Sequence, residues 1–203
     1  VRTARALGLG TKPSTELGGE TAGTLPDERW LARSRADGRW LPGDAINASI
    51  GQGAVSASAM QMAVVAATAA TGGTIPTPHY VRGIPRPGRR GPGSAAFWAA
   101  ERRALERVMT SGTGRALRID GVRWAGKTGS AEHGRSARSH AWFVAYAPAD
   151  DPKIAICTMA ESAGHGGEVA GPIAREIVAT YLSKLSKRAA AASASAGDSP
   201  IRR

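Results

Sequence analysis

Residues 127–130 read Lys-Thr-Gly-Ser and bring an ammonium, two hydroxyls and a glycine into four consecutive positions. Side chains of an extended strand alternate between its two faces, so Thr128 and Ser130 would share one face while Lys127 lies on the other. Two neighbouring hydroxyls can donate to a carboxylate, and a nearby ammonium strengthens such bonds. Gly129 leaves room for the backbone of a ligand. The pattern is typical of an anion-binding strand, although a surface turn can carry the same residues.

The segments that follow this tetrapeptide predict a β-hairpin. Residues 141–147 and 153–160 are short apolar runs rich in aromatic and β-branched residues, and the turn sequence Pro-Ala-Asp-Asp-Pro separates them. Both runs are apolar on both faces, which indicates a sheet that is covered on each side. Residues 121–129 could form a third, short strand beside them.

Three helices are predicted to cover that sheet. The first begins after the cap Ser58 and ends near Gly72, and because it has almost no charged residue we expect burial on most sides. The second begins after Ser94, ends near Gly112 and is amphipathic. The third begins near Pro172, and its apolar stripe consists of Ile173, Ile177, Val178, Tyr181, Leu182 and Leu185.

The two ends of the chain differ from this middle part. Residues 1–55 are rich in glycine, proline and polar turn formers, which predicts an extended, loop-rich segment that packs on the remainder. Residues 183–203 are low in complexity and are predicted to be disordered. We therefore expect one folded portion over residues 1–182. No apolar run is long enough for a membrane span or a signal peptide, and the missing initiating methionine favours a fragment or a processed product.

Composition limits the function classes. The formal net charge is +11, from 27 Lys and Arg against 16 Asp and Glu. The cations are scattered and not interleaved with aromatic residues, so a basic nucleic-acid-binding module stays only as a minor alternative. The single cysteine, Cys157, excludes an internal disulfide and a cysteine-rich zinc site. The histidines share no metal-ligand spacing, so we expect no metal; they are His79, His133, His140 and His165.

Several colinear segments around the Lys-Thr-Gly strand resemble the penicillin-recognising serine transpeptidases, and within them the class B penicillin-binding proteins of the penicillin-binding protein 2 group. One is Gly-Asp-Ala-Ile-Asn-Ala-Ser-Ile-Gly-Gln-Gly, which contains that family's Gly-Gln-Gly segment. Another is the helix start at residues 58–62, where Ser-Ala stands in place of the family's Thr-Pro. The others are residues 7–26, 71–81, 140–161 and 170–182.

This resemblance implies an α/β fold of the β-lactamase and transpeptidase type, in which an antiparallel sheet is flanked by helices. It also implies that the N-terminal half of the domain is absent, so that only three of the family's five strands are present. The implied activity is serine-type peptidoglycan D,D-transpeptidation in cell wall synthesis. Lys127 and Ser130 are then expected to act in catalysis, the Ser130 N–H in the oxyanion hole. Lys127, Thr128, Gly129 and Ser130 would bind the D-Ala-D-Ala end of a stem peptide or a β-lactam.

The chain departs from the family in its nucleophile. No serine stands three residues before any lysine, so the S-x-x-K motif is missing, and Ala45 stands where the S-x-N motif would need a serine before Asn47. The 203 residues alone are therefore expected to be inactive, and a non-catalytic β-lactam sensor domain remains an alternative.

The resemblance also implies partners and location. We expect stem peptides, β-lactams and other cell-wall synthesis proteins as partners, with no cofactor and no nucleic acid. Family members are anchored in the cytoplasmic membrane through an N-terminal span that these residues do not contain, with this domain outside the cytoplasm.

Overall fold

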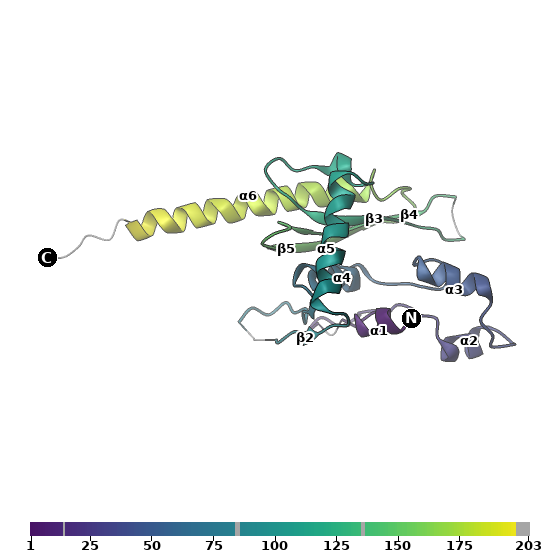
Figure 1. The fold of residues 1–203 in the computed structure, drawn as a ribbon. Coiled ribbons are helices and arrows are strands. Elements are labelled where there is room, and N and C mark those ends of the chain that lie inside the picture. The colour runs from purple at the N-terminus through teal and green to yellow at the C-terminus, as the bar shows by residue number, and fades with distance from the viewer. Residues whose placement is uncertain (14, 84–85, 135–136, 198–203) are drawn as a thin grey trace.

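A computed structural model describes residues 1–13, 15–83, 86–134 and 137–197 of the chain (Figure 1). The helices and strands follow in the order α1 Arg2–Ala6, α2 Glu28–Ser34, α3 Pro42–Ser49, α4 Ala59–Ala70, β1 Thr74–Ile75, β2 Arg89–Arg90, α5 Ala95–Thr110, the 3-10 turn η1 Arg115–Leu117, β3 Ala125–Ala131, β4 His140–Ala147, β5 Ile154–Ala160 and α6 Ala170–Gly197. Within the described residues, no helix is long and apolar enough to cross a membrane.

The central sheet has three antiparallel strands in the order β3-β4-β5. The register places Lys127 beside Val144, and Val144 beside Cys157. The predicted hairpin is therefore confirmed, with boundaries that differ by one residue, and the Lys-Thr-Gly segment forms the third strand. The three strands expected from the resemblance are present, together with a separate two-stranded ribbon of β1 and β2.

Helices cover both faces of this sheet, as its apolar strands predict. Ala141, Phe143, Ala145 and Ala147 alternate along β4 and pack on one face with Ala174 and Val178 of α6. Tyr146 lies on the other face with Ala69 and Ala70 of α4 and Trp98 of α5. In Figure 1, α5 crosses the sheet, whereas α6 runs along it and projects beyond it. Within these layers, β3 forms one edge of the sheet.

The two central helices begin where the sequence predicts. The Ser58 side chain accepts a hydrogen bond from the Gln61 N–H while the Gln61 side chain accepts from the Ser58 N–H, a reciprocal cap that starts α4. The Gln61 amide also donates to the carbonyls of Thr11 and Ala22, so this buried polar side chain ties the N-terminal segment to α4. Ser94 caps α5 through the Phe97 N–H.

The N-terminal segment is more ordered than its composition predicts. Residues 1–55 contain three short helices, α1, α2 and α3, where an extended, loop-rich stretch was expected. Local helix-start signals explain two of them: Asp27 caps α2 through the Trp30 N–H, and Pro42 opens α3 with its fixed backbone angle. Such caps stabilise a few turns without any apolar periodicity, which is why the pattern missed them.

Helix α6 differs from prediction in two respects. It continues to Gly197, whereas disorder was expected from residue 183, and residues 198–203 lie outside the described part. Alanine is the best helix former, and the alanine-rich run therefore extends the helix although residues 183–193 are exposed. The predicted apolar stripe is also split, because only Val178 and Leu182 pack on the core. The remaining members are 37% to 46% exposed: Ile173, Ile177, Tyr181 and Leu185.

Candidate active site

Strand β3 presents the Lys-Thr-Gly-Ser residues with the predicted alternation. Thr128 lies beside Phe143 and Ser130 beside Ala141, which belong to the core on the α6 side of the sheet. Lys127 lies beside Val144 on the opposite side. The Lys127 and Ser130 side chains are exposed and Thr128 is half-buried, so the tetrapeptide is accessible at the edge of the sheet.

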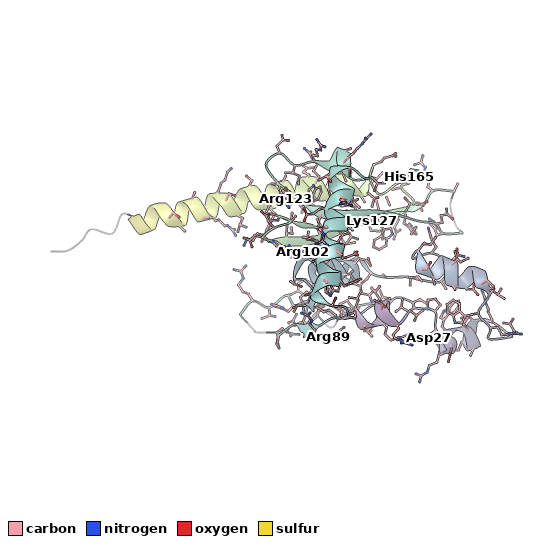
Figure 2. All side chains as sticks on the ribbon, in the orientation of Figure 1. Asp27, Arg89, Arg102, Arg123, Lys127 and His165 are labelled. Atoms are coloured by element: carbon pink, nitrogen blue, oxygen red, sulfur yellow. The ribbon has the colours of Figure 1, made fainter. Side chains whose placement is uncertain are left out.

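The Lys127 side chain borders an apolar hollow on the α4 and α5 side of the sheet. The hollow has a volume of about 580 Å³. Its walls include Met62, Val65, Phe97 and Leu105. The aliphatic part of the lysine contributes to this wall, while its Nζ donates to the Thr128 carbonyl at 2.7 Å. Figure 2 shows Lys127 where α5 crosses the sheet. The ammonium is thereby held close to the backbone of the strand edge.

Each hydroxyl on the other face has a hydrogen-bonding neighbour. Thr128 Oγ1 lies 2.8 Å from Thr113 Oγ1, which follows α5. Ser130 Oγ lies 3.3 Å from Nδ1 of His165, in the loop between β5 and α6. The two pairs form a polar row of four side chains along this side of β3. Since hydroxyl and imidazole groups can both donate, the row can hold a carboxylate.

The loop between β5 and α6 passes tightly over β3. A Cβ placed on Gly166 would come within 2.0 Å of the Trp142 carbonyl oxygen and 2.4 Å of the Gly129 carbonyl oxygen. Only glycine therefore lets the loop reach the strand and bring His165 to Ser130. The chain that approaches Gly129 is therefore the protein's own loop, whereas the sequence predicts the backbone of a ligand at this position.

The backbone of β3 also faces outward at its free edge. Gln52 donates from Nε2 to the Ser130 carbonyl at 3.0 Å, and its Oε1 accepts from the Glu132 N–H at 3.2 Å. In an antiparallel strand the N–H and C=O of one residue point to the same side. The Ser130 N–H consequently points away from β4, in the direction that an oxyanion-binding amide requires.

A second group of polar side chains lies at the same end of the sheet. The rings of His133 and His140 stack with centroids 4.0 Å apart. Ser162 joins them, because its N–H donates to His140 Nδ1 at 3.0 Å and its Oγ lies 3.0 Å from His133 Nε2. Ser162 also adopts a left-handed backbone with φ of 49°. The cluster fixes the start of the loop that carries His165.

Metal binding has no support in the described residues. They contain no group of three His, Cys, Asp or Glu side chains that could hold an ion. Cys157 lies in β5, and burial raises the pKa of its thiol to about 12, which keeps it protonated.

The sequence did not identify three of the residues at this site. Thr113, His165 and Gln52 reach β3 from separate parts of the chain, and such contacts leave no periodic pattern. A local signal was present in each case, since each residue stands next to a glycine. Polar residues in glycine-rich turns are the ones that short loops can bring to a strand edge.

The site thus defines a class of protein: an α/β domain whose accessible edge strand presents a lysine, two hydroxyls and an outward amide. The family model of the penicillin binding protein transpeptidase domain matches residues 1–179. The chain belongs to that family.

Individual relatives agree with this membership. The chain is 35% identical to the peptidoglycan D,D-transpeptidase MrdA of Acinetobacter baumannii over 82% of its own length and 28% of that protein. It is similar to the Helicobacter pylori penicillin-binding protein PBP2 solved in complex with MreC, at 30% identity and a TM-score of 0.79, over 89% of this chain and 34% of that one. An imipenem acyl-enzyme complex of penicillin-binding protein A from M. tuberculosis matches at 29% identity with a TM-score of 0.71, over 89% and 41%. The chain spans roughly a third of the length of the proteins it matches, as the 28%, 34% and 41% shares show.

Proposed function

We propose that this chain forms the carboxylate-binding part of a peptidoglycan D,D-transpeptidase site. The observation that carries the proposal is the accessible edge of β3, where the two hydroxyls, the Lys127 ammonium and the outward Ser130 N–H come together. The family membership and the name of the A. baumannii relative support the same activity.

Each residue has a proposed role. Thr128 and Ser130 would donate hydrogen bonds to the terminal carboxylate of a D-Ala-D-Ala stem peptide or of a β-lactam. Lys127 would add positive charge, and the missing side chain of Gly129 would leave the ligand unobstructed beside the loop that already crosses this residue. The Ser130 N–H would stabilise the oxyanion that forms when a serine attacks the penultimate carbonyl. The terminal D-alanine then leaves, and an amine of a neighbouring peptidoglycan strand displaces the serine from the acyl-enzyme.

The nucleophile is not among these 203 residues, which contain no S-x-x-K and no S-x-N sequence. We therefore assign it to the part of the family's domain that this chain does not cover. We also propose that the complete protein is held in the cytoplasmic membrane by an anchor outside these residues, with this domain outside the cytoplasm. The MreC complex of the H. pylori neighbour supports a partner among cell-wall synthesis proteins.

A non-catalytic β-lactam sensor is the second candidate, because it would use the same binding strand without turnover. The two differ in deacylation and in the use of an acceptor amine, which belong to the complete protein. A nucleic-acid module has less support, since the polar row at β3 is suited to a single carboxylate.

Intact mass spectrometry after exposure to penicillin tests the assignment. The 203 residues alone should gain no mass, whereas a longer protein that joins them to an S-x-x-K segment should gain one penicillin. A stoichiometric adduct on the short chain would show that a serine within residues 1–203 is the nucleophile.

A further inference from the structure

We propose that Gln52 is a positioning residue that holds the outer edge of β3 and thereby fixes the direction of the Ser130 backbone groups. The proposal rests on the proposed function, because it concerns the same strand. Its basis is the pair of hydrogen bonds from one side-chain amide to the Ser130 carbonyl and the Glu132 N–H.

The backbone around Gln52 is held by the end of α3. The Gly51 N–H donates to the Ala48 carbonyl and the Gln52 N–H donates to the Asn47 carbonyl. This pair of bonds is the Schellman arrangement, which requires a left-handed residue directly after the helix. Gly51 supplies it with φ of 75°, and Gly53 has φ of 72° on the other side. The Gly-Gln-Gly sequence therefore directs one long polar side chain outward from a fixed turn.

Helix α3 is also held at its other end. Arg35 forms two hydrogen bonds with the Asp44 carboxylate, at 2.6 and 2.7 Å, and Asp44 accepts a third from the Leu41 N–H at 2.8 Å. Since both ends of the helix are fixed, the Gln52 side chain reaches β3 from a rigid support. Figure 1 shows α3 beneath the end of the sheet where β3 ends and β4 begins.

The chemistry of the amide explains why glutamine occupies this position. A neighbouring antiparallel strand would offer β3 one donor and one acceptor, and the glutamine amide offers both from a single side chain. It occupies the Ser130 carbonyl and the Glu132 N–H, so the edge available to an extended ligand ends at the Ser130 N–H. The same contact prevents the free end of β3 from rotating, which keeps that N–H directed outward.

Two substitutions of Gln52 separate the effect of its donated hydrogen bond from the effect of its accepted one. Gln52→Ala removes both bonds, whereas Gln52→Glu keeps an oxygen for the Glu132 N–H but loses the donor to Ser130. Ser49→Ala is the matched control, because the Ser49 hydroxyl is exposed and donates within its own helix to the Ile46 carbonyl. All three variants lie within four residues of one another.

The first measurement is amide hydrogen exchange at Glu132 in the 203-residue chain. We expect exchange to be about tenfold faster in Gln52→Ala, and near the unsubstituted rate in Gln52→Glu and Ser49→Ala. An unchanged exchange rate in Gln52→Ala would show that the Gln52 side chain does not bond the Glu132 N–H. Because Gln52→Glu retains a bond, it serves as the folded reference if the alanine variant unfolds.

The second measurement is the rate of acylation by penicillin in a longer protein that also carries the S-x-x-K segment. We expect Gln52→Ala and Gln52→Glu each to be about tenfold slower than the unsubstituted protein, with Ser49→Ala unchanged. Faster exchange at Glu132 with unchanged acylation overturns the positioning role. If the unsubstituted protein forms no acyl-enzyme, the proposed function fails, and the exchange result still decides whether Gln52 holds the strand.

Discussion

The two edges of the central sheet differ in chemistry and in what covers them. The β3 edge is polar, contains glycine, and is partly occupied by Gln52. Strand β5 pairs with β4 on one side, and the described residues place no strand against its other side. The strand at that second edge includes Ile154, Ile156 and Met159 and contains no charged residue, because Lys153 lies just before it.

The difference shows how one sheet can serve both binding and assembly. An edge strand offers unpaired backbone groups to any extended chain, and polar or occupied positions restrict which chain can pair. At β3 the proposed ligand is a short one with a terminal carboxylate. At β5 no such restriction exists, so that edge is suited to a further strand of the same domain.

The largest effect is expected at the β3 edge. In a protein that also carries the nucleophile, Lys127→Ala and Thr128→Val should each slow acylation by penicillin while leaving the fold intact. Losing a charge-assisted contact costs about 1.5 to 3 kcal/mol, or roughly one to two decades in rate. Stopped-flow acylation measures this change. Unaltered rates in both variants would remove β3 as the carboxylate-binding strand and leave the two edges functionally alike.

The next effect concerns the loop that crosses β3. Gly166→Ala should lower the free energy of unfolding by about 1 to 3 kcal/mol, because its Cβ would meet two backbone carbonyl oxygens that cannot move aside easily. Gly134→Ala is the control, since a Cβ there has no atom within 4 Å. Urea denaturation of both variants checks the difference. Equal stabilities would mean that the loop does not press on Gly129.

The unpaired edge of β5 should cause the chain to self-associate. The 203 residues alone should associate as their concentration rises, and Met159→Lys should weaken this because a charge on an edge strand opposes pairing. Met159 is 39% exposed, and Ile46→Lys adds the same charge to a residue that is 65% exposed on α3. Sedimentation velocity at several concentrations compares the three proteins. A compact monomer throughout would show that another segment covers β5.

The smallest effect should come from the support of Gln52. The Arg35 guanidinium lowers the pKa of Asp44 below its ordinary value, with the Leu41 N–H acting in the same direction. A carboxylate with a lowered pKa stabilises the folded state above its ordinary pKa of about 4, and this stability is lost as pH falls through the lowered value. The pair is 31% and 23% exposed, so the contribution is small.

Thermal unfolding of the unsubstituted chain and Asp44→Asn at pH 7 and pH 2 tests that support. The unsubstituted chain should be the more stable at pH 7, and the difference in unfolding temperature between the two proteins should be smaller at pH 2. An equal difference in unfolding temperature at both pH values would show that the stabilisation does not come from the Arg35–Asp44 ion pair.

The sequence predicted those parts of the fold that local signals determine. Ser58 and Ser94 cap their helices, the Pro-Ala-Asp-Asp-Pro turn defines the hairpin, and the period of two places Thr128 and Ser130 on one face. These features depend on neighbours within a few residues, so a single sequence contains enough information to find them.

Contacts between distant segments were not predictable in the same way. Gln52 reaches Ser130 across 78 positions, and His165 reaches it across 35. Neither contact follows from periodicity, because both depend on how loops pack after the sheet has formed. The helical run after residue 182 was missed for a different reason, since an alanine-rich composition is compatible with either low complexity or a stable helix.

The two halves of helix α6 should respond differently to heating. Ala174 and Val178 are fully buried against the sheet, so opening that half requires disruption of the core. Residues 183–193 are exposed, and their helical bonds depend on alanine propensity instead of packing. Heating should therefore melt the outer half gradually from its far end, well before the cooperative transition of the domain. The ellipticity at 222 nm should accordingly slope with temperature even while the sheet remains native.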